Sequence, residues 1–141
     1  MRVLALDIGR KKIGVAISDA LGITAQGLKT VFRKNPQTDF IAVKDIVDEM
    51  GVGTIVVGLP LNMDGSPGPK AQEAKEFAEG LSNFTSAPVR MWDERLTTLQ
   101  ATRTLLEADI SRTKRKKLDD KIAAQLMLQS YLDSLTQSKE E

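Results

Sequence analysis

Four carboxylates in this sequence stand where an acid is either costly or well placed for chemistry: Asp7, Glu94, Asp119 and Asp120. Asp7 lies within an otherwise apolar segment, Val3 to Gly9, that has the pattern of a β-strand. A carboxylate buried there is costly unless a metal ion, an Arg or Lys side chain or a phosphate-bound cation meets its charge. An Asp that ends a strand and caps a turn is the alternative. The basic run Arg10-Lys11-Lys12 and the second strand that follow favour a compensated charge.

The sequence contains no His and no Cys, and this absence restricts the available chemistry. Ser-His-Asp and Cys-His catalysis are excluded, and so are the usual ligand sets for zinc. A bound metal must therefore be held by oxygen ligands, which suits Mg²⁺ or Mn²⁺.

The other three acids lie at predicted element boundaries. Glu94 follows a predicted strand, and Thr97 with Gln100 has the spacing of a capping box that would start the next helix. Asp119 and Asp120 open the last predicted helix, and periodicity does not decide which of the two faces the core. The alternative is that both are ordinary first-turn acids, which the helix dipole favours.

Basic residues adjoin these acids although the net charge is only +1, so the pattern is one of clustering. The candidate substrate-binding residues are Arg10, Lys11, Lys12, Arg95, Arg112, Lys114, Arg115 and Lys116. Acids that hold cations, beside bases that hold phosphates, form a site for a polyanion; a solvated charged surface is the alternative. Two oxygen-ligated metals can stabilise both the attacking and the leaving oxygen of a phosphoryl displacement, and this chemistry needs no His.

The elements that must position these residues alternate between strands and helices. Strands are expected at residues 2–9, 13–19, 25–33, 54–58 and 88–93, and helices at 40–50, 71–81, from 97 and at 118–135. This order predicts an α/β fold with a mixed five-stranded sheet and helices on both faces. One domain is expected over residues 1–136, with a disordered tail at 137–141.

Bulk properties narrow the setting of the protein. No apolar run approaches the roughly 18 residues that a membrane span needs, and the chain enters a strand at once, without the features of a signal peptide. A cytoplasmic location is therefore expected.

Several other residues have a structural interpretation beside a functional one. Arg95 either contacts a scissile phosphate or pairs with Asp93 or Glu94, and neither is favoured. The Asn62-x-Asp64-Gly pattern is at least as typical of a turn as of a substrate contact. Trp92 and Tyr131 are expected in the core.

Four segments, in order along nearly the whole chain, resemble the motifs of the YqgF (RuvX) family, known as Holliday-junction resolvases and pre-16S rRNA nucleases. They are LDIGRKKIGVA at residues 6–16, VGLPLNMDGS at 57–66, WDERLTT at 92–98, and DKIAA at 120–124 followed by LQSYL at 128–132. Arg10 stands where the family often has Thr, and Lys12 where it often has Arg, so substrate preference is open.

The resemblance implies an RNase H-like fold and a divalent-metal nuclease in which Asp7, Glu94 and Asp120 are the catalytic metal ligands. It selects Asp120 over Asp119. It implies structured nucleic acid as the partner, and we favour 5′-end processing of pre-16S rRNA over resolution of four-way DNA junctions. A non-catalytic nucleic-acid adaptor and an actin–hexokinase-type ATPase are the rival classes, although the chain is short for the latter. Both a monomer and a homodimer remain open.

Overall fold

The computed structural model describes residues 1–62, 64–96 and 122–135. The elements run β1 (Arg2–Ile8), β2 (Lys12–Ser18), β3 (Ala25–Phe32), α1 (Pro36–Met50), β4 (Val52–Leu59), α2 (Pro69–Ser82) and β5 (Val89–Asp93). A further helix occupies residues 122–135. The predicted strands are confirmed in number and order, and their bounds differ from the expected ones by two residues or fewer.

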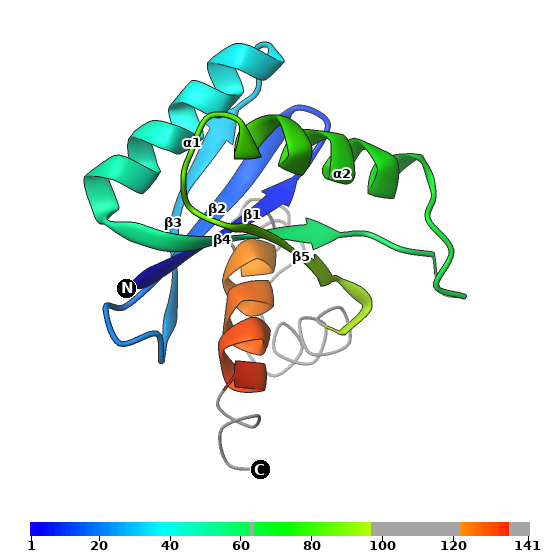
Figure 1. The fold of residues 1–141 in the computed structure, drawn as a ribbon. Coiled ribbons are helices and arrows are strands. Elements are labelled where there is room, and N and C mark those ends of the chain that lie inside the picture. Colours follow the sequence, from blue (N-terminus) through cyan, green and yellow to red (C-terminus); the bar gives the residue numbers. More distant parts are fainter. Residues whose placement is uncertain (63, 97–121, 136–141) are drawn as a thin grey trace, which may run out of the picture.

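The five strands form one mixed sheet in the order β3-β2-β1-β4-β5 (Figure 1). β1, β2 and β3 are joined by antiparallel pairing, whereas β4 and β5 run parallel to β1. The carboxyl ends of β1, β4 and β5 therefore lie at one edge of the sheet. In open α/β sheets this is the edge at which ligands bind.

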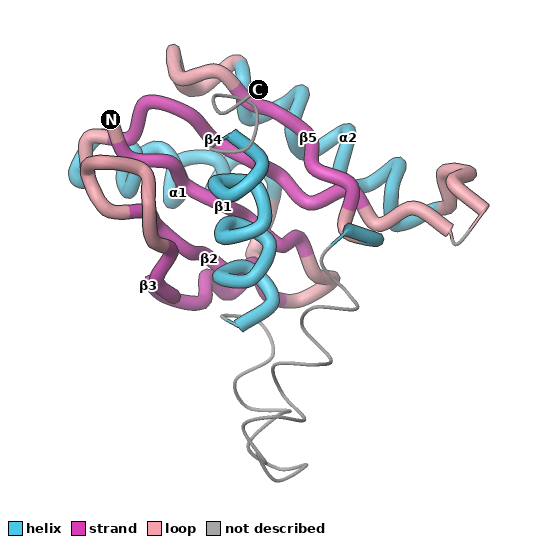
Figure 2. Tube along the Cα trace, turned by 90° about the horizontal axis from the view of Figure 1, so that it is seen from below, coloured by secondary structure: helices cyan, strands magenta, loops and turns pink. Residues whose placement is uncertain are grey.

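Helices cover both faces of the sheet, as predicted (Figures 1 and 2). On one face, α1 and α2 bury side chains that include Phe40, Val43 and Phe77 against Leu4, Leu6 and other strand residues. On the other face, helix 122–135 packs Ala124, Met127, Leu128 and Leu132 on the sheet. The alternating sides of each strand thus enter two separate cores, which is why β1 and β4 are apolar almost throughout.

α1 and α2 both begin before their predicted positions, and α2 starts at Pro69 instead of residue 71. α1 begins at Pro36, before the periodicity that starts at Phe40, because the Asn35 side chain accepts a hydrogen bond from Thr38 N at 2.9 Å and caps the helix. The predicted start at Thr97 lies outside the described residues, and Arg95 and Leu96 before it are already helical. The Asp93 carboxylate accepts the Arg95 N–H at 3.0 Å and takes the capping role there.

Some expectations fall on residues outside the described ranges, namely the capping pair Thr97 and Gln100, the start of the last helix at 118–121 and the tail at 137–141. Within the described ranges, no helix has both the length and the apolar character needed to cross a membrane.

Candidate active site

The structure brings together two of the predicted ligands, Asp7 and Glu94. Asp7 is the penultimate residue of β1, and Glu94 directly follows β5, with β4 lying between these strands. The Glu94 N–H donates to the carbonyl of Leu59, the last residue of β4, at 3.1 Å, which fixes the backbone that carries the acid. The two carboxyl groups are hydrogen-bonded to each other. Parallel alignment of the strands therefore converts distant sequence positions into one acidic pair.

Gly58 on β4 leaves the space that the Glu94 carboxyl group occupies. A Cβ atom at this position would overlap Glu94 Oε1 and would lie 2.8 Å from Met127 Sδ. Any larger residue at position 58 would have to push Glu94, Met127 or both away. The glycine thus forms a cradle that directs the Glu94 carboxyl group toward Asp7.

The environment of Glu94 strongly disfavours its charged form. Burial, followed by the charge of Asp7 and the hydrogen bond with it, raises the pKa of Glu94 from 4.5 to about 8, although Lys70 acts in the opposite direction. Two adjacent carboxylates cannot both ionise cheaply without a cation. Near neutral pH, and without a cation, the pair therefore retains a proton.

Replacing Glu94 with Gln should stabilise the metal-free protein at alkaline pH. Between pH 4.5 and about 8 the folded state holds a proton on Glu94 that the unfolded state has lost, so the free energy of unfolding falls as pH rises. In EDTA at pH 8, the free energy of unfolding of Glu94→Gln should exceed that of the wild type by on the order of 2 kcal/mol. At pH 5 the two values should differ little. Urea unfolding at both pH values measures this, and Glu79→Gln, an exposed acid on α2, is the control. Equal pH profiles for wild type and Glu94→Gln would contradict it.

The third proposed ligand, Asp120, lies outside the described residues, as does its neighbour Asp119. The same holds for the basic residues Arg112, Lys114, Arg115 and Lys116. Within the described ranges there is no cluster of three or more acids able to hold a metal. Helix 122–135 packs Met127 beside Gly58 and Glu94, on the face that carries the acidic pair.

Arg95 pairs with Asp93, which was one of the two predicted alternatives. Its Nη2 lies 2.7 Å from Asp93 Oδ2, and its Nε contacts both carboxylate oxygens at 3.0 and 3.1 Å. These contacts lower the pKa of the Asp93 carboxyl. The pairing holds the guanidinium beside Glu94 in one position, while a contact with phosphate stays a prediction.

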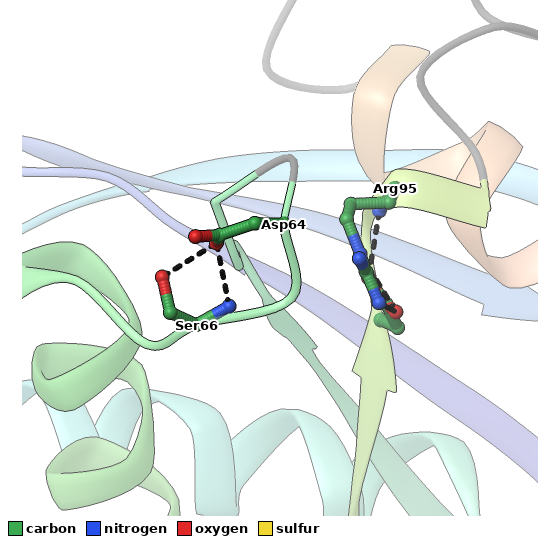
Figure 3. Close-up of polar contacts among 4 residues, drawn as sticks. Asp64, Ser66 and Arg95 are labelled. Carbon is green, nitrogen blue, oxygen red and sulfur yellow. Dashed lines mark hydrogen bonds and ion pairs between the residues drawn. The ribbon is translucent and has the colours of Figure 1, made fainter.

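The loop after β4 is organised by Asn62 and Asp64, which confirms their predicted turn-forming role. The Asp64 carboxylate accepts hydrogen bonds from Ser66 N at 2.9 Å and Ser66 Oγ at 2.6 Å, and these lower its pKa. Gly65 takes a φ of 89°, which favours glycine. Figure 3 shows Asp64 and Ser66 in this loop, opposite Arg95 on the segment that follows β5. The turn lies close to Arg95, since a Cβ at Gly65 would be 3.3 Å from Arg95 Nη1.

Sequence reasoning missed Lys70 as a residue of the site. Lys70 stands in the first turn of α2, and its charge acts on Glu94. It also lines a cleft of about 620 Å³ together with Gly9, Arg10, Asn62 and Glu73. Lys70 directly follows Gly68-Pro69, where the long loop after β4 ends and α2 begins. This position was the sequence signal that could have identified it. The predicted residue Arg10 lies in the same cleft.

Trp92 and Tyr131 were predicted in the core; they are half-buried and pack against it. Their rings meet edge to face with centroids 5.7 Å apart, and both pack against the core below helix 122–135. This contact ties β5 to the helix and so supports the backbone on which Glu94 stands.

Two relatives with the same name match nearly the whole chain. A protein of Clostridium botulinum (strain Hall) named "Putative pre-16S rRNA nuclease" is 53% identical over 136 residues, which are 96% of this chain and 99% of the relative. A protein of Myxococcus xanthus with the same name is 51% identical over 134 residues, covering 95% of this chain and 89% of the relative.

Two solved structures share the fold at low sequence identity. RuvC of Thermus thermophilus, in complex with a Holliday junction substrate, superposes with a TM-score of 0.62 at 14% identity, covering 96% of this chain and 97% of that one. The resolvase of fowlpox virus with Holliday junction DNA gives a TM-score of 0.55 at 18% identity, with coverages of 96% and 99%.

These likenesses confirm the predicted RNase H-like fold, with its mixed five-stranded sheet. Residues 1–134 match the family model described as "RuvX: Holliday junction resolvase". With this match and relatives that are more than half identical over almost their full length, the chain belongs to the RuvX family.

Proposed function

We propose that the protein is a divalent-metal-dependent nuclease that hydrolyses phosphodiester bonds in structured nucleic acid. One observation carries the proposal: two carboxyl groups from different strands, Asp7 and Glu94, share a hydrogen bond in a space that Gly58 keeps open. Such a costly pair is stabilised when a cation joins it. Its position at the carboxyl ends of the parallel strands β1, β4 and β5 is that of a ligand site.

The residues present fit a divalent metal. The donors are carboxylate oxygens in a chain without His or Cys, which suits Mg²⁺ or Mn²⁺ and not zinc. Asp7 and Glu94, with Asp120 as the third ligand, would hold the ion. When bound, it would supply Lewis-acid stabilisation of the attacking and leaving oxygens of the phosphodiester.

The chain's own residues bind and orient the substrate around this site. Lys70 and Arg10 line one cleft, and the charge of Lys70 acts on Glu94, so both are suited to hold phosphates of the substrate. The backbone contact between Glu94 N and Leu59 O fixes the acid, so that its carboxylate does not have to reorganise during the reaction. We assign further substrate contacts to Lys11, Lys12, Arg95, Arg112, Lys114, Arg115 and Lys116.

The biological substrate that we favour is the 5′ region of precursor 16S rRNA. Relatives at 51–53% identity are named "Putative pre-16S rRNA nuclease". They are far closer in sequence than the junction-binding structures, which are 14–18% identical. Resolution of four-way DNA junctions is the second candidate, which the description of the family model favours. We propose a cytoplasmic site of action, as a monomer or a homodimer.

The deciding experiment incubates the wild-type protein with a precursor rRNA fragment and with a four-way DNA junction, in Mn²⁺ and in excess EDTA. We expect metal-dependent cleavage of the RNA and weaker or no cleavage of the junction. The reverse preference would establish the resolvase function. Binding of both without cleavage in any divalent metal would establish the adaptor function, and undiminished cleavage in EDTA would falsify the metal mechanism.

Binding should weaken steeply with salt. With about four phosphate contacts, affinity should fall roughly 100-fold between 50 and 200 mM salt, because Lys and Arg contacts release counterions from the nucleic acid. Arg10→Ala should reduce the slope of log K against log salt by about 1. Lys44→Ala is the control, since Lys44 lies on α1 and faces Asp48 at 3.9 Å. Fluorescence anisotropy measures the slopes, and a flat response would contradict the basic surface.

A further inference from the structure

Phe32, at the end of β3, is an exposed aromatic side chain on the surface near the acidic pair. Its relative exposure is 66%, whereas the other described aromatic residues are buried or half-buried. The Lys12 ammonium lies 5.6 Å from the centroid of its ring. An exposed aromatic ring beside cations offers both a face for base stacking and charge for the backbone.

Phe32 lies on the same face of the sheet as Asp7. Asp7 pairs with Gly14, and Lys12 pairs with Phe32, in antiparallel registers that put paired residues on one face. Lys12 and Gly14 are two residues apart on β2 and therefore share that face as well. Strand spacing places the Cα atoms of Asp7 and Phe32 roughly 12 Å apart. That span corresponds to about three stacked nucleotides of one strand.

A basic cleft of about 730 Å³ adjoins Phe32 on the opposite face of the sheet, which α1 and α2 cover, since Phe40 and Phe77 also line it. Its β-strand side is lined by Phe32 together with Arg10, Lys11, Arg33 and Lys34, and its α2 wall by Glu73, Glu76 and Phe77. Arg10 and Glu73 also line the cleft beside Lys70, so the two clefts adjoin. Because the acids stand on the α2 wall, a polyanion is expected to follow the strand side.

Arg33 gives this cleft a fixed floor, with its charge paired by Asp39. Its Nε lies 3.4 Å from the buried carboxylate of Asp39, its Nη1 donates to Gly9 O at 2.9 Å, and its guanidinium lies 5.5 Å from the Phe77 ring centroid. These contacts join the β1–β2 turn to α1 and α2. The strand side of the cleft is therefore preorganised before a ligand binds.

We propose that this surface binds an unpaired stretch of the substrate adjoining the cleaved bond, with a base stacked on Phe32 and phosphates held by Arg10, Lys11 and Lys34. The proposal rests on the proposed nuclease function and specifies its substrate class: a duplex or structured nucleic acid with a single-stranded extension. The ring binds any base, since stacking requires only a π face. Arg10 and Lys11 stand in the β1–β2 turn, which directly follows the strand of Asp7, and bind the backbone between that base and the acids.

The test measures binding in EDTA, so it does not depend on cleavage. The full chain is titrated with an RNA hairpin carrying a six-nucleotide unpaired tail and with the same hairpin without the tail, and 2-aminopurine in the tail reports stacking. Phe32→Ala should weaken binding of the tailed RNA about tenfold. It should change the affinity for the hairpin without a tail less than twofold. It should also abolish the quenching of 2-aminopurine fluorescence in the tailed hairpin. Phe32→Trp should restore both affinity and quench.

The matched control is Leu21→Ala, because Leu21 is also exposed (81%) but lies in the β2–β3 turn at the other end of these strands. It should leave both affinities unchanged. Wild-type affinity of Phe32→Ala for the tailed RNA, or equal loss on both RNAs, would overturn the proposal. The proposal would also be overturned if Phe32→Ala differed from the wild type in oligomeric state in sedimentation, since the ring would then bind a second copy of the chain. A protein that binds as expected but cleaves nothing in Mn²⁺ would instead contradict the nuclease function.

Discussion

Asp7→Asn should lower the rate of cleavage about 10³-fold or more while binding is retained or strengthened. The substitution removes one of the oxygen donors and the negative charge that hold the cation, and a bound metal supplies several kcal/mol of transition-state stabilisation. It also removes a negative charge from the path of a polyanion, so the affinity for nucleic acid should not fall. Single-turnover cleavage in Mn²⁺ and anisotropy measure the two effects separately.

The matched control for this variant is Asp45→Asn, an exposed acid on α1 that faces away from the site. It should cleave at the wild-type rate. Cleavage by Asp7→Asn within tenfold of the wild type would show that Asp7 holds no catalytic metal. Loss of binding together with loss of cleavage would show that the acid maintains the fold of the surface instead.

Gly58→Ala should lower cleavage about 100-fold although no acid is removed. The added Cβ would overlap Glu94 Oε1 and lie 2.8 Å from Met127 Sδ, so the carboxyl group must move away from Asp7. A displacement of about 1 Å in a catalytic group is enough to cost this much. The variant should also bind Mn²⁺ more weakly, which calorimetry measures independently of the nuclease assay.

Gly53→Ala, near the other end of β4, is the matched control. It separates the displacement of Glu94 from the effect of any Gly→Ala substitution in this strand. Its Cβ would lie 2.7 Å from Met1 Cβ and 3.0 Å from Met1 Sδ, but Met1 is 87% exposed and free to move. Gly53→Ala should therefore keep nearly full activity. Equal activity of the two variants would mean that the space at position 58 does not position Glu94.

Local patterns in the sequence predicted most of the fold. Strand and helix order follow from apolar periodicity, and the turn at Asn62 and Asp64 follows from turn chemistry. The pattern did not show that Arg95 and Leu96 are already helical, because the capping-box spacing at Thr97 and Gln100 is short and common. Asp93, two residues before Arg95, supplies the cap instead.

By itself, the sequence determined the alternating elements, the oxygen-only donor set and the acids and bases from which a phosphodiester-cleaving site can be built, because these depend on residue type and short-range spacing. Only the tertiary structure decided that Asp7 meets Glu94, that Gly58 leaves room for their contact, and that Lys70 acts on the pair. It also decided that Phe32 is exposed on the face of Asp7. These relations depend on which strands lie side by side and in what register, and that is set by packing between segments far apart in the chain.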